Sequence, residues 1–204
     1  MREGERAAAA LGCRAHTGWA VLVVVTGGVA RPEVVFRGRG ELGDPGGRVR
    51  KNVYHAARAL EPGGAAELVE AGERIAAEQA AAALERTLRE ARSEGAVVRS
   101  CAVVVGAPSG GTPLDTILRS HALVHVAEGR LYQDALLQGA ESLGLGALAV
   151  PKQSIWEQGE EALGLARDEL RQWIDGLRRE LGPPWAQDQK LAALAAWIAL
   201  ARPP

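Results

Sequence analysis

The stretch Ala7–Val25 contains two short apolar runs, Ala7–Cys13 and Trp19–Val25, on either side of a polar segment. Short, nearly continuous apolar runs predict β-strands that are covered on both faces. The polar segment Arg14–Gly18 ends in a glycine, which can adopt the backbone angles of a tight turn. We therefore predict a central pair of strands, with the polar segment at a strand end, where open sheets usually carry their sites.

The length and charge of the chain exclude several classes of protein. Its 204 residues are enough for a full core, and we expect a single domain over residues 1–204. The net charge of −1 provides no overall field for nucleic acid or a membrane, so any basic surface is local. No apolar run approaches the roughly 18 residues of a membrane-spanning helix, and the chain start lacks a signal-peptide pattern. We therefore expect a cytoplasmic protein with no membrane partner.

The chain has two cysteines, Cys13 and Cys101, each inside an apolar run. This placement predicts buried, reduced thiols. A cysteine-based zinc site is not expected, because two cysteines without a close pair lack the required ligand spacing.

The remainder of the chain alternates helical and strand-like patterns. Apolar residues at three- and four-residue steps predict helices, and Ser154 with Glu157 has the spacing of a capping box. The predicted elements are a strand at Glu33–Leu42, a short helix at Arg48–Leu60, a long helix at Ala65–Ser93, a strand at Ala96–Ala107, a loop at Pro108–Pro113, a helix at Leu114–Leu143, a strand at Ala147–Val150, a helix from Ser154 to Gly164, a helix at Asp168–Leu181 and a final helix at Trp185–Ala201. This order predicts an α/β fold, a mixed sheet with helices on both faces.

Three segments resemble motifs of a known superfamily. Leu11–Ala20 (LGCRAHTGWA) is similar to a first-strand signature of hydrophobic-Gly-hydrophobic-Asp followed by Thr-Gly-aromatic-Ala. Ala127–Pro151 resembles the helix and strand that follow the fourth strand, and Asp188–Leu194 resembles the last helix. The chain thus resembles the ribonuclease H-like superfamily and, within it, the RuvC-type Holliday-junction resolvases. The resemblance implies a mixed five-stranded sheet (a three-strand antiparallel meander plus two parallel strands), branched or structured nucleic acid as partner, and a homodimer.

The acidic motif of that family is degenerate in this chain. Family nucleases hold two Mg²⁺ ions with acids from the first strand, the fourth strand and the last helix, because hard cations need several anionic oxygens. Here Arg14 occupies the first-strand position, the segment Ala102–Gly106 has no acid, and the last helix keeps Asp188 but has Leu191 three residues later. We therefore expect a RuvC-like protein without the two-metal site and without a cofactor, acting in nucleic-acid binding or as a structural or regulatory subunit.

Two alternatives remain open at this point. An active Mg²⁺- or Mn²⁺-dependent nuclease or hydrolase would use a rearranged set of His121, His125, Glu128 and Asp188. A nucleotide-binding protein of the actin-like ATPase group has a similar opening hairpin, but that fold normally needs two such domains.

The predicted sheet end collects several side chains that are able to carry chemistry. If the last helix begins near the first strand, one end of the sheet collects Arg14, His16, Thr17, Asp188 and Lys190, and Arg14 pairs with Asp188. The pair is either structural or part of a functional site. The catalytic candidates are Arg14, His16, Asp188, Lys190 and Glu128.

The helix predicted at Leu114–Leu143 has His121, His125 and Glu128 at positions i, i+4 and i+7, which places them on one face. Two imidazoles and a carboxylate are able to bind Zn²⁺ or a similar ion. The competing interpretation is that these three side chains form a half-buried polar strip on the helix and bind no metal.

The segment between residues 31 and 58 is the most basic of the chain. Its cations either follow a phosphate backbone or cover a solvated strand face. The nucleic-acid candidates are Arg37, Arg39, Arg48, Arg50 and Lys51. Trp185 after two prolines either stacks on a base or packs in the core.

Overall fold

The computed structural model describes residues 7–28, 30–106 and 111–202. The end of the predicted fourth strand at residue 107 and the first half of the loop predicted over residues 108–113 lie outside the described residues. Within the described chain, no helix is both long enough and apolar enough to cross a membrane.

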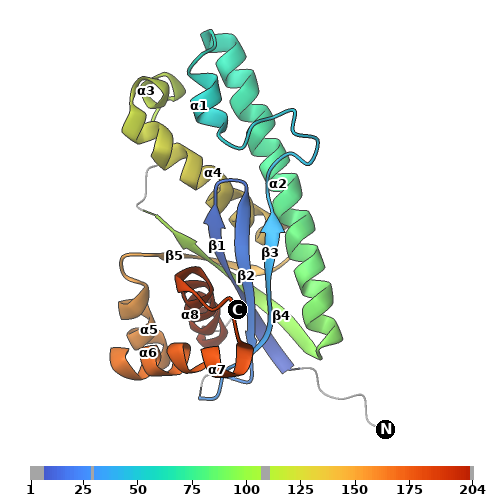
Figure 1. The fold of residues 1–204 in the computed structure, drawn as a ribbon, viewed down its shortest axis with the longest axis vertical. Coiled ribbons are helices and arrows are strands. Elements are labelled where there is room, and N and C mark those ends of the chain that lie inside the picture. Colours follow the sequence, from blue (N-terminus) through green and yellow to red (C-terminus); the bar gives the residue numbers. More distant parts are fainter. Residues whose placement is uncertain (1–6, 29, 107–110, 203–204) are drawn as a thin grey trace.

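A five-stranded mixed sheet forms the centre of the fold (Figure 1). Its strands are β1 (Ala7–His16), β2 (Trp19–Thr26), β3 (Glu33–Glu41), β4 (Ala96–Val105) and β5 (Gly146–Pro151). Their order across the sheet is β3-β2-β1-β4-β5. The β1–β2 and β2–β3 pairs are antiparallel, whereas β1–β4 and β4–β5 are parallel. The predicted meander plus two parallel strands is therefore confirmed.

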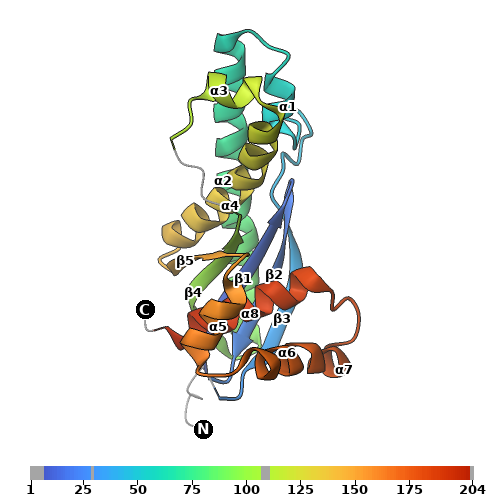
Figure 2. The same cartoon turned by 90° about the vertical axis from the view of Figure 1, so that its left-hand side faces the viewer.

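Helices cover both faces of this sheet, as Figure 2 shows. One face packs against α2 (Pro62–Ser93) and α4 (His121–Ser142), with α1 (Val53–Ala57) and α3 (Leu114–Arg119) beyond it. The other face packs against α5 (Ile155–Leu163), α6 (Arg167–Gly176) and α8 (Gln187–Ala201), with α7 (Arg178–Leu181) beside them. The strands β1 and β2 and the segment Cys101–Val104 of β4 are largely buried from two sides, which explains their nearly continuous apolar runs.

The strand β1 is longer than predicted. It continues past its apolar run, because Arg14 pairs with Val21 and His16 pairs with Trp19 across the hairpin. Thr17 and Gly18 alone form the turn. Alternation along a strand sends Arg14 and His16 to the same face, so polar side chains at its end do not require a loop.

Several predicted helices have different boundaries in the structure: the helix predicted over residues 168–181, for example, is divided into α6 and α7, and the final helix begins at Gln187. The helix predicted over residues 114–143 is interrupted at Ser120, whose extended backbone ends α3 and whose side chain accepts a hydrogen bond from the N–H of Leu123. A serine in this position stabilises the start of the second helix, α4. The predicted helix at residues 48–60 is helical only over Val53–Ala57, and α2 begins at Pro62, because proline is well suited to a first helical turn.

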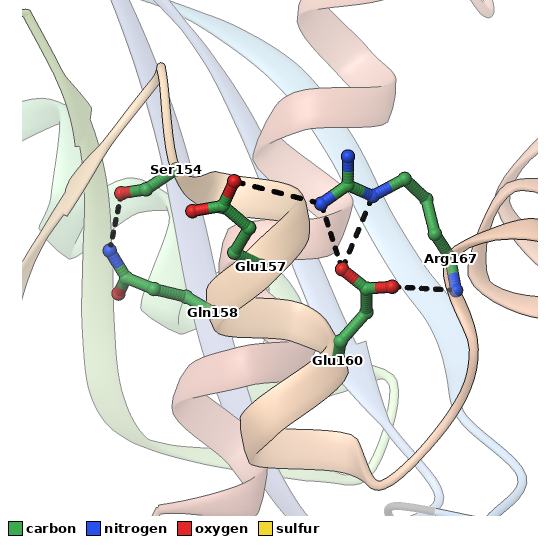
Figure 3. Close-up of polar contacts among 5 residues, drawn as sticks. All are labelled: Ser154, Glu157, Gln158, Glu160 and Arg167. Carbon is green, nitrogen blue, oxygen red and sulfur yellow. Dashed lines mark hydrogen bonds and ion pairs between the residues drawn. The ribbon is translucent and has the colours of Figure 1, made fainter.

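The predicted capping box at Ser154 is absent (Figure 3). The Ser154 hydroxyl accepts from the Gln158 side chain at 3.0 Å. The carboxylate of Glu157 lies 3.9 Å from Arg167. Glu160 binds the same arginine through two guanidinium nitrogens, at 2.8 and 3.2 Å, and accepts its backbone N–H at 3.1 Å. Glu157 therefore helps to join α5 to α6 rather than capping its own helix.

The two cysteines are free and fully buried, as predicted. Their sulfur atoms lie 3.6 Å apart between β1 and β4. Burial raises the pKa of the Cys13 thiol, and the neighbouring Cys101 adds to that effect.

Helix α8 lies directly on β1 because the strand has a glycine at the contact. A Cβ on Gly12 would lie 1.8 Å from the carbonyl oxygen of Ala192. Only a glycine therefore permits this approach. The contact brings the first turn of α8, with Asp188, to the end of β1.

Candidate functional site

An ionic cluster lies where β1 ends and α8 begins. The Asp188 carboxylate lies 3.7 Å from Nε of Arg14 and 3.0 Å from Nε2 of His16. All three side chains are partly exposed, with 17% of Arg14, 32% of His16 and 34% of Asp188 accessible. The predicted Arg14–Asp188 pair is thus present, and His16 is its third member. We call these three residues the sheet-end cluster.

A tryptophan extends the sheet-end cluster across the neighbouring strands. The Trp19 indole stacks on the His16 ring, with centroids 4.2 Å apart and planes only 8° from parallel. The guanidinium carbon of Arg39 lies 4.1 Å from the Trp19 ring, and its Nε contacts Glu41 at 2.6 Å. Sequence reasoning missed Trp19, although the two residues that flank a two-residue turn face each other in a hairpin.

Among the residues that the structure describes, Asp188 is the one carboxylate of the sheet-end cluster. The neighbouring segment of β4 contributes Ala102, Val103 and Val104, which are fully buried. Within the described ranges, the one group of three ligand side chains close enough to share an ion lies elsewhere. A lone carboxylate beside a guanidinium is a poor ligand set for Mg²⁺.

Lys190 does not join the sheet-end cluster, contrary to prediction. Its ammonium pairs with Asp175 of α6 at 2.6 Å. The reason is helical geometry, since two positions along α8 rotate the side chain away from the face that carries Asp188.

Three histidines gather at the other candidate site, between α1 and α4. The Nε2 atoms of His121 and His125 lie 3.0 Å apart. The ring of His55 approaches both, with centroids 4.8 Å from His125 and 5.9 Å from His121. One ligand atom from each ring lies within 4.8 Å of the others. We call these residues the histidine cluster.

Glu128 occupies a different role from the one predicted. Its Oε1 accepts the backbone N–H of His55 at 3.0 Å and contacts Nδ1 of that ring at 3.2 Å. It is therefore the partner of a histidine rather than the third member of the group. Sequence reasoning missed His55 because it lies on another helix, and nothing in the local pattern links it to α4. The rearranged set of His121, His125, Glu128 and Asp188 is not assembled at one site, because Asp188 pairs with Arg14 in the sheet-end cluster.

Burial and the charge of Glu128 act on two nearby tyrosines. Tyr132 donates to the carbonyl of Lys51 at 2.7 Å, and desolvation followed by the Glu128 charge raises the pKa of Tyr132 to about 12. Tyr54 donates to Glu73 at 3.1 Å, and its pKa is raised mainly by burial and then by that carboxylate. Both phenols are therefore neutral hydrogen-bond donors near neutral pH.

The loop over residues 42–52 is held against the β1–β2 turn. The carbonyl of Gly18 accepts from the N–H groups of Leu42, at 2.9 Å, and Gly43, at 3.2 Å. The aliphatic stem of Lys51 lies against the same glycine. These contacts place the loop beside the sheet-end cluster.

Asp44 organises the interior of this loop. Its carboxylate accepts the N–H groups of Gly46, Arg48 and Val49 at 2.8–3.0 Å. The pKa of Asp44 is lowered mainly by the hydrogen bond from the Val49 N–H and next by the hydrogen bond from the Gly46 N–H. The loop presents three exposed cations, Arg48, Arg50 and Lys51.

The Arg37 side chain binds backbone carbonyl groups of the protein itself. Its guanidinium donates to the four consecutive carbonyls that lead from α7 towards α8, at 2.6–3.2 Å. These carbonyls belong to Leu181, Gly182, Pro183 and Pro184. Arg37, one of the five candidates for nucleic-acid binding, thus uses its guanidinium for contacts within the protein.

Trp185 is buried and donates to the carbonyl of Ile174 at 2.8 Å, which supports the interpretation that it packs in the core.

The similarities of this chain to known proteins are confined to solved structures. No protein-family model matches the sequence, and no curated protein matches it significantly. Among solved structures, the chain is similar to T. thermophilus RuvC in complex with a Holliday junction substrate, at 15% identity and a TM-score of 0.49, over 93% of this chain and 90% of that chain. It is also similar to a Thermus thermophilus RuvC structure, at 13% identity and a TM-score of 0.47, over 93% and 92%. Identities this low transfer no residue role to this chain.

Proposed function

We propose that the chain is a RuvC-like protein that binds branched or structured nucleic acid without cleaving it by two-metal chemistry. The observation that carries this proposal is the sheet-end cluster. Arg14 and His16 both contact Asp188, where the family resemblance places a group of metal-binding acids. A fixed positive charge a few ångströms from a lone carboxylate opposes the entry of a divalent cation.

Support for nucleic-acid binding comes from the surroundings of the cluster. The loop over residues 42–52 presents Arg48, Arg50 and Lys51 to solvent beside the end of β1. Phosphate contacts of this kind supply most of the affinity of nucleic-acid-binding proteins.

The binding test compares a four-way DNA junction with duplex DNA of the same length. The junction is the substrate class named for one of the similar structures. Binding is measured by fluorescence anisotropy between 50 and 200 mM salt. We expect a preference for the junction. The triple variant Arg48→Ala/Arg50→Ala/Lys51→Ala weakens binding and reduces the salt slope by about one for every phosphate that is no longer neutralised.

A matched control removes the same number of charges elsewhere. Arg86, Arg89 and Arg92 are exposed on the last turns of α2, next to the opposite end of the sheet, where Gly95 binds Ala7. Their triple alanine variant retains junction binding. Equal weakening in both triple variants contradicts the placement of the surface, and no binding by the wild-type chain contradicts the proposal as a whole.

The cleavage test incubates the labelled junction with the protein and Mg²⁺ or Mn²⁺. We expect no cleavage. Cleavage that disappears in Asp188→Asn shows that the site retains metal chemistry and overturns the proposal. Sedimentation of the free protein tests the homodimer that the family resemblance implies.

A further inference from the structure

We infer that His55, His121 and His125 form a binding site for a divalent transition-metal ion of the zinc type, positioned by Glu128. The inference does not depend on the proposed nucleic-acid function, because the site lies between α1 and α4 and shares no residue with the sheet-end cluster. The structure holds three imidazoles from two separate helices around one point.

The spacing of the nitrogen atoms fits a single ion. Two ligands on one tetrahedral zinc ion lie about 3.3 Å apart, given zinc–nitrogen bonds of about 2.0 Å. The Nε2 atoms of His121 and His125 are 3.0 Å apart, so a small rotation of either ring accommodates the ion. His125 follows His121 by one helical turn, which directs both rings to the same side of α4.

The helix break at Ser120 also contributes to the position of His121 in the histidine cluster. Because α4 begins at His121, the first histidine lies in the opening turn, where the chain approaches α1. Figure 1 shows α1 next to the start of α4. His55 is partly buried, whereas the other two rings are exposed, so the site opens to solvent. Three protein ligands and an open side leave a fourth position for water or a substrate oxygen.

Glu128 provides the second, independent observation. Its side chain is only 5% exposed, and its Oε1 contacts Nδ1 of His55 at 3.2 Å. This contact assigns the ring proton to Nδ1, which leaves Nε2 of His55 as an electron-pair donor. A carboxylate that binds the remote nitrogen of a metal ligand is a recurrent feature of zinc sites, where it fixes the tautomer and raises the basicity of the ring.

The second oxygen of Glu128 strengthens this argument. Oε2 is buried and has no hydrogen-bond partner among the residues that the structure describes. A buried carboxylate is costly unless a positive charge lies nearby. A divalent ion on the far side of the His55 ring supplies that charge.

The ligand type selects the metal. Imidazole nitrogen favours zinc, copper, nickel and iron, whereas Mg²⁺ and Mn²⁺ prefer carboxylate and water oxygens. The site is therefore chemically different from a two-magnesium nuclease centre. A bound ion ties α1 to α4 and keeps one coordination position available.

Isothermal titration of the full chain with zinc sulfate, after removal of any affinity tag, tests the inference. We expect saturable binding of one ion per chain, a rise in the melting temperature, and a tetrahedral absorption spectrum with Co²⁺. His125→Ala and His121→Gln both abolish stoichiometric binding. These side chains are exposed, so both variants are expected to fold, and circular dichroism checks this.

The matched control uses the fourth histidine of the chain. His16 lies in the sheet-end cluster, so His16→Ala retains one-to-one binding. Glu128→Gln keeps the stoichiometry but weakens affinity by about 10- to 100-fold, as expected for the loss of an outer-sphere carboxylate. No saturable zinc binding by the wild-type chain, or binding that persists in both His125→Ala and His121→Gln, overturns the inference.

Discussion

Gly12 of β1 and Ala192 of α8 approach so closely that a Cβ on the glycine would lie 1.8 Å from the alanine carbonyl oxygen. The same Cβ would lie 2.9 Å from the backbone nitrogen of Ala196. Both neighbours are backbone atoms, which cannot rotate away as a flexible side chain does. This contact fixes the height of α8 above the sheet, and with it the position of Asp188.

Gly12→Ala is therefore expected to destabilise the protein strongly. Overpacking a core commonly costs about 1–3 kcal/mol, and a clash with backbone lies at the upper end, so we expect a decrease of about 3 kcal/mol or more in the free energy of unfolding. Urea unfolding measures it. The control is Gly176→Ala on α6, where a Cβ meets nothing within 4 Å and stability changes by less than about 1 kcal/mol. Wild-type stability in Gly12→Ala would contradict this packing of α8 on β1.

Arg37→Ala is expected to reduce stability rather than nucleic-acid binding alone. The substitution removes charge-assisted hydrogen bonds to the four carbonyls from Leu181 to Pro184, and we expect a decrease of about 2–3 kcal/mol in the free energy of unfolding. Arg37→Lys restores little, because an ammonium lacks the planar fork that contacts several carbonyls together. Chemical denaturation of Arg37→Ala beside Arg39→Ala measures the difference. Equal, small effects in the two variants would refute a structural role for Arg37.

The two thiols are expected to resist modification in the folded protein. Burial raises the pKa of Cys13, and the thiolate is the reactive form. A colourimetric disulfide reagent should therefore titrate neither thiol in native buffer and both in denaturant. Rapid reaction of a thiol under native conditions would show that the sheet opens between β1 and β4 more readily than its burial implies.

The stability of the protein is expected to fall in alkaline solution. In the unfolded chain tyrosine ionises near pH 10, whereas the pKa of Tyr132 in the fold is raised to about 12. The unfolded state therefore loses its proton first, so the free energy of unfolding is unaffected below about pH 10 and decreases as the pH rises from about 10 to about 12.

Both tyrosines of the chain have raised pKa values, so the native protein should show little tyrosinate absorbance at about pH 10. Tyr132→Phe removes one ionising group, and the alkaline slope of stability should become shallower. A native absorbance titration with ordinary tyrosine midpoints would contradict the burial of both phenols.

The sheet was predictable because its signals are local. The apolar runs around Arg14–Gly18 and the spacing of Ala65–Ser93 depend on residues that are neighbours in the chain. The same holds for His121 and His125, which share a face because they are one helical turn apart.

The remaining features depend on contacts between distant segments. His55 reaches the other histidines only through the packing of α1 on α4, and a basic stretch does not reveal that Arg37 binds a distant turn. The prediction for Lys190 is wrong because proximity to Asp188 in the chain does not determine the direction of a side chain on a helix. Ser120 ends one helix and begins another through a backbone conformation that apolar periodicity does not encode.

The loop over residues 42–52 has its two ends fastened to different parts of the molecule. Hydrogen bonds to Gly18 hold the first end at the hairpin, and the second end enters the helix that carries His55. Its span therefore cannot lengthen unless the hairpin contact breaks or α1 unwinds. The basic side chains of this loop and the first ring of the histidine cluster are therefore carried by one short segment that begins at the hairpin and ends in α1.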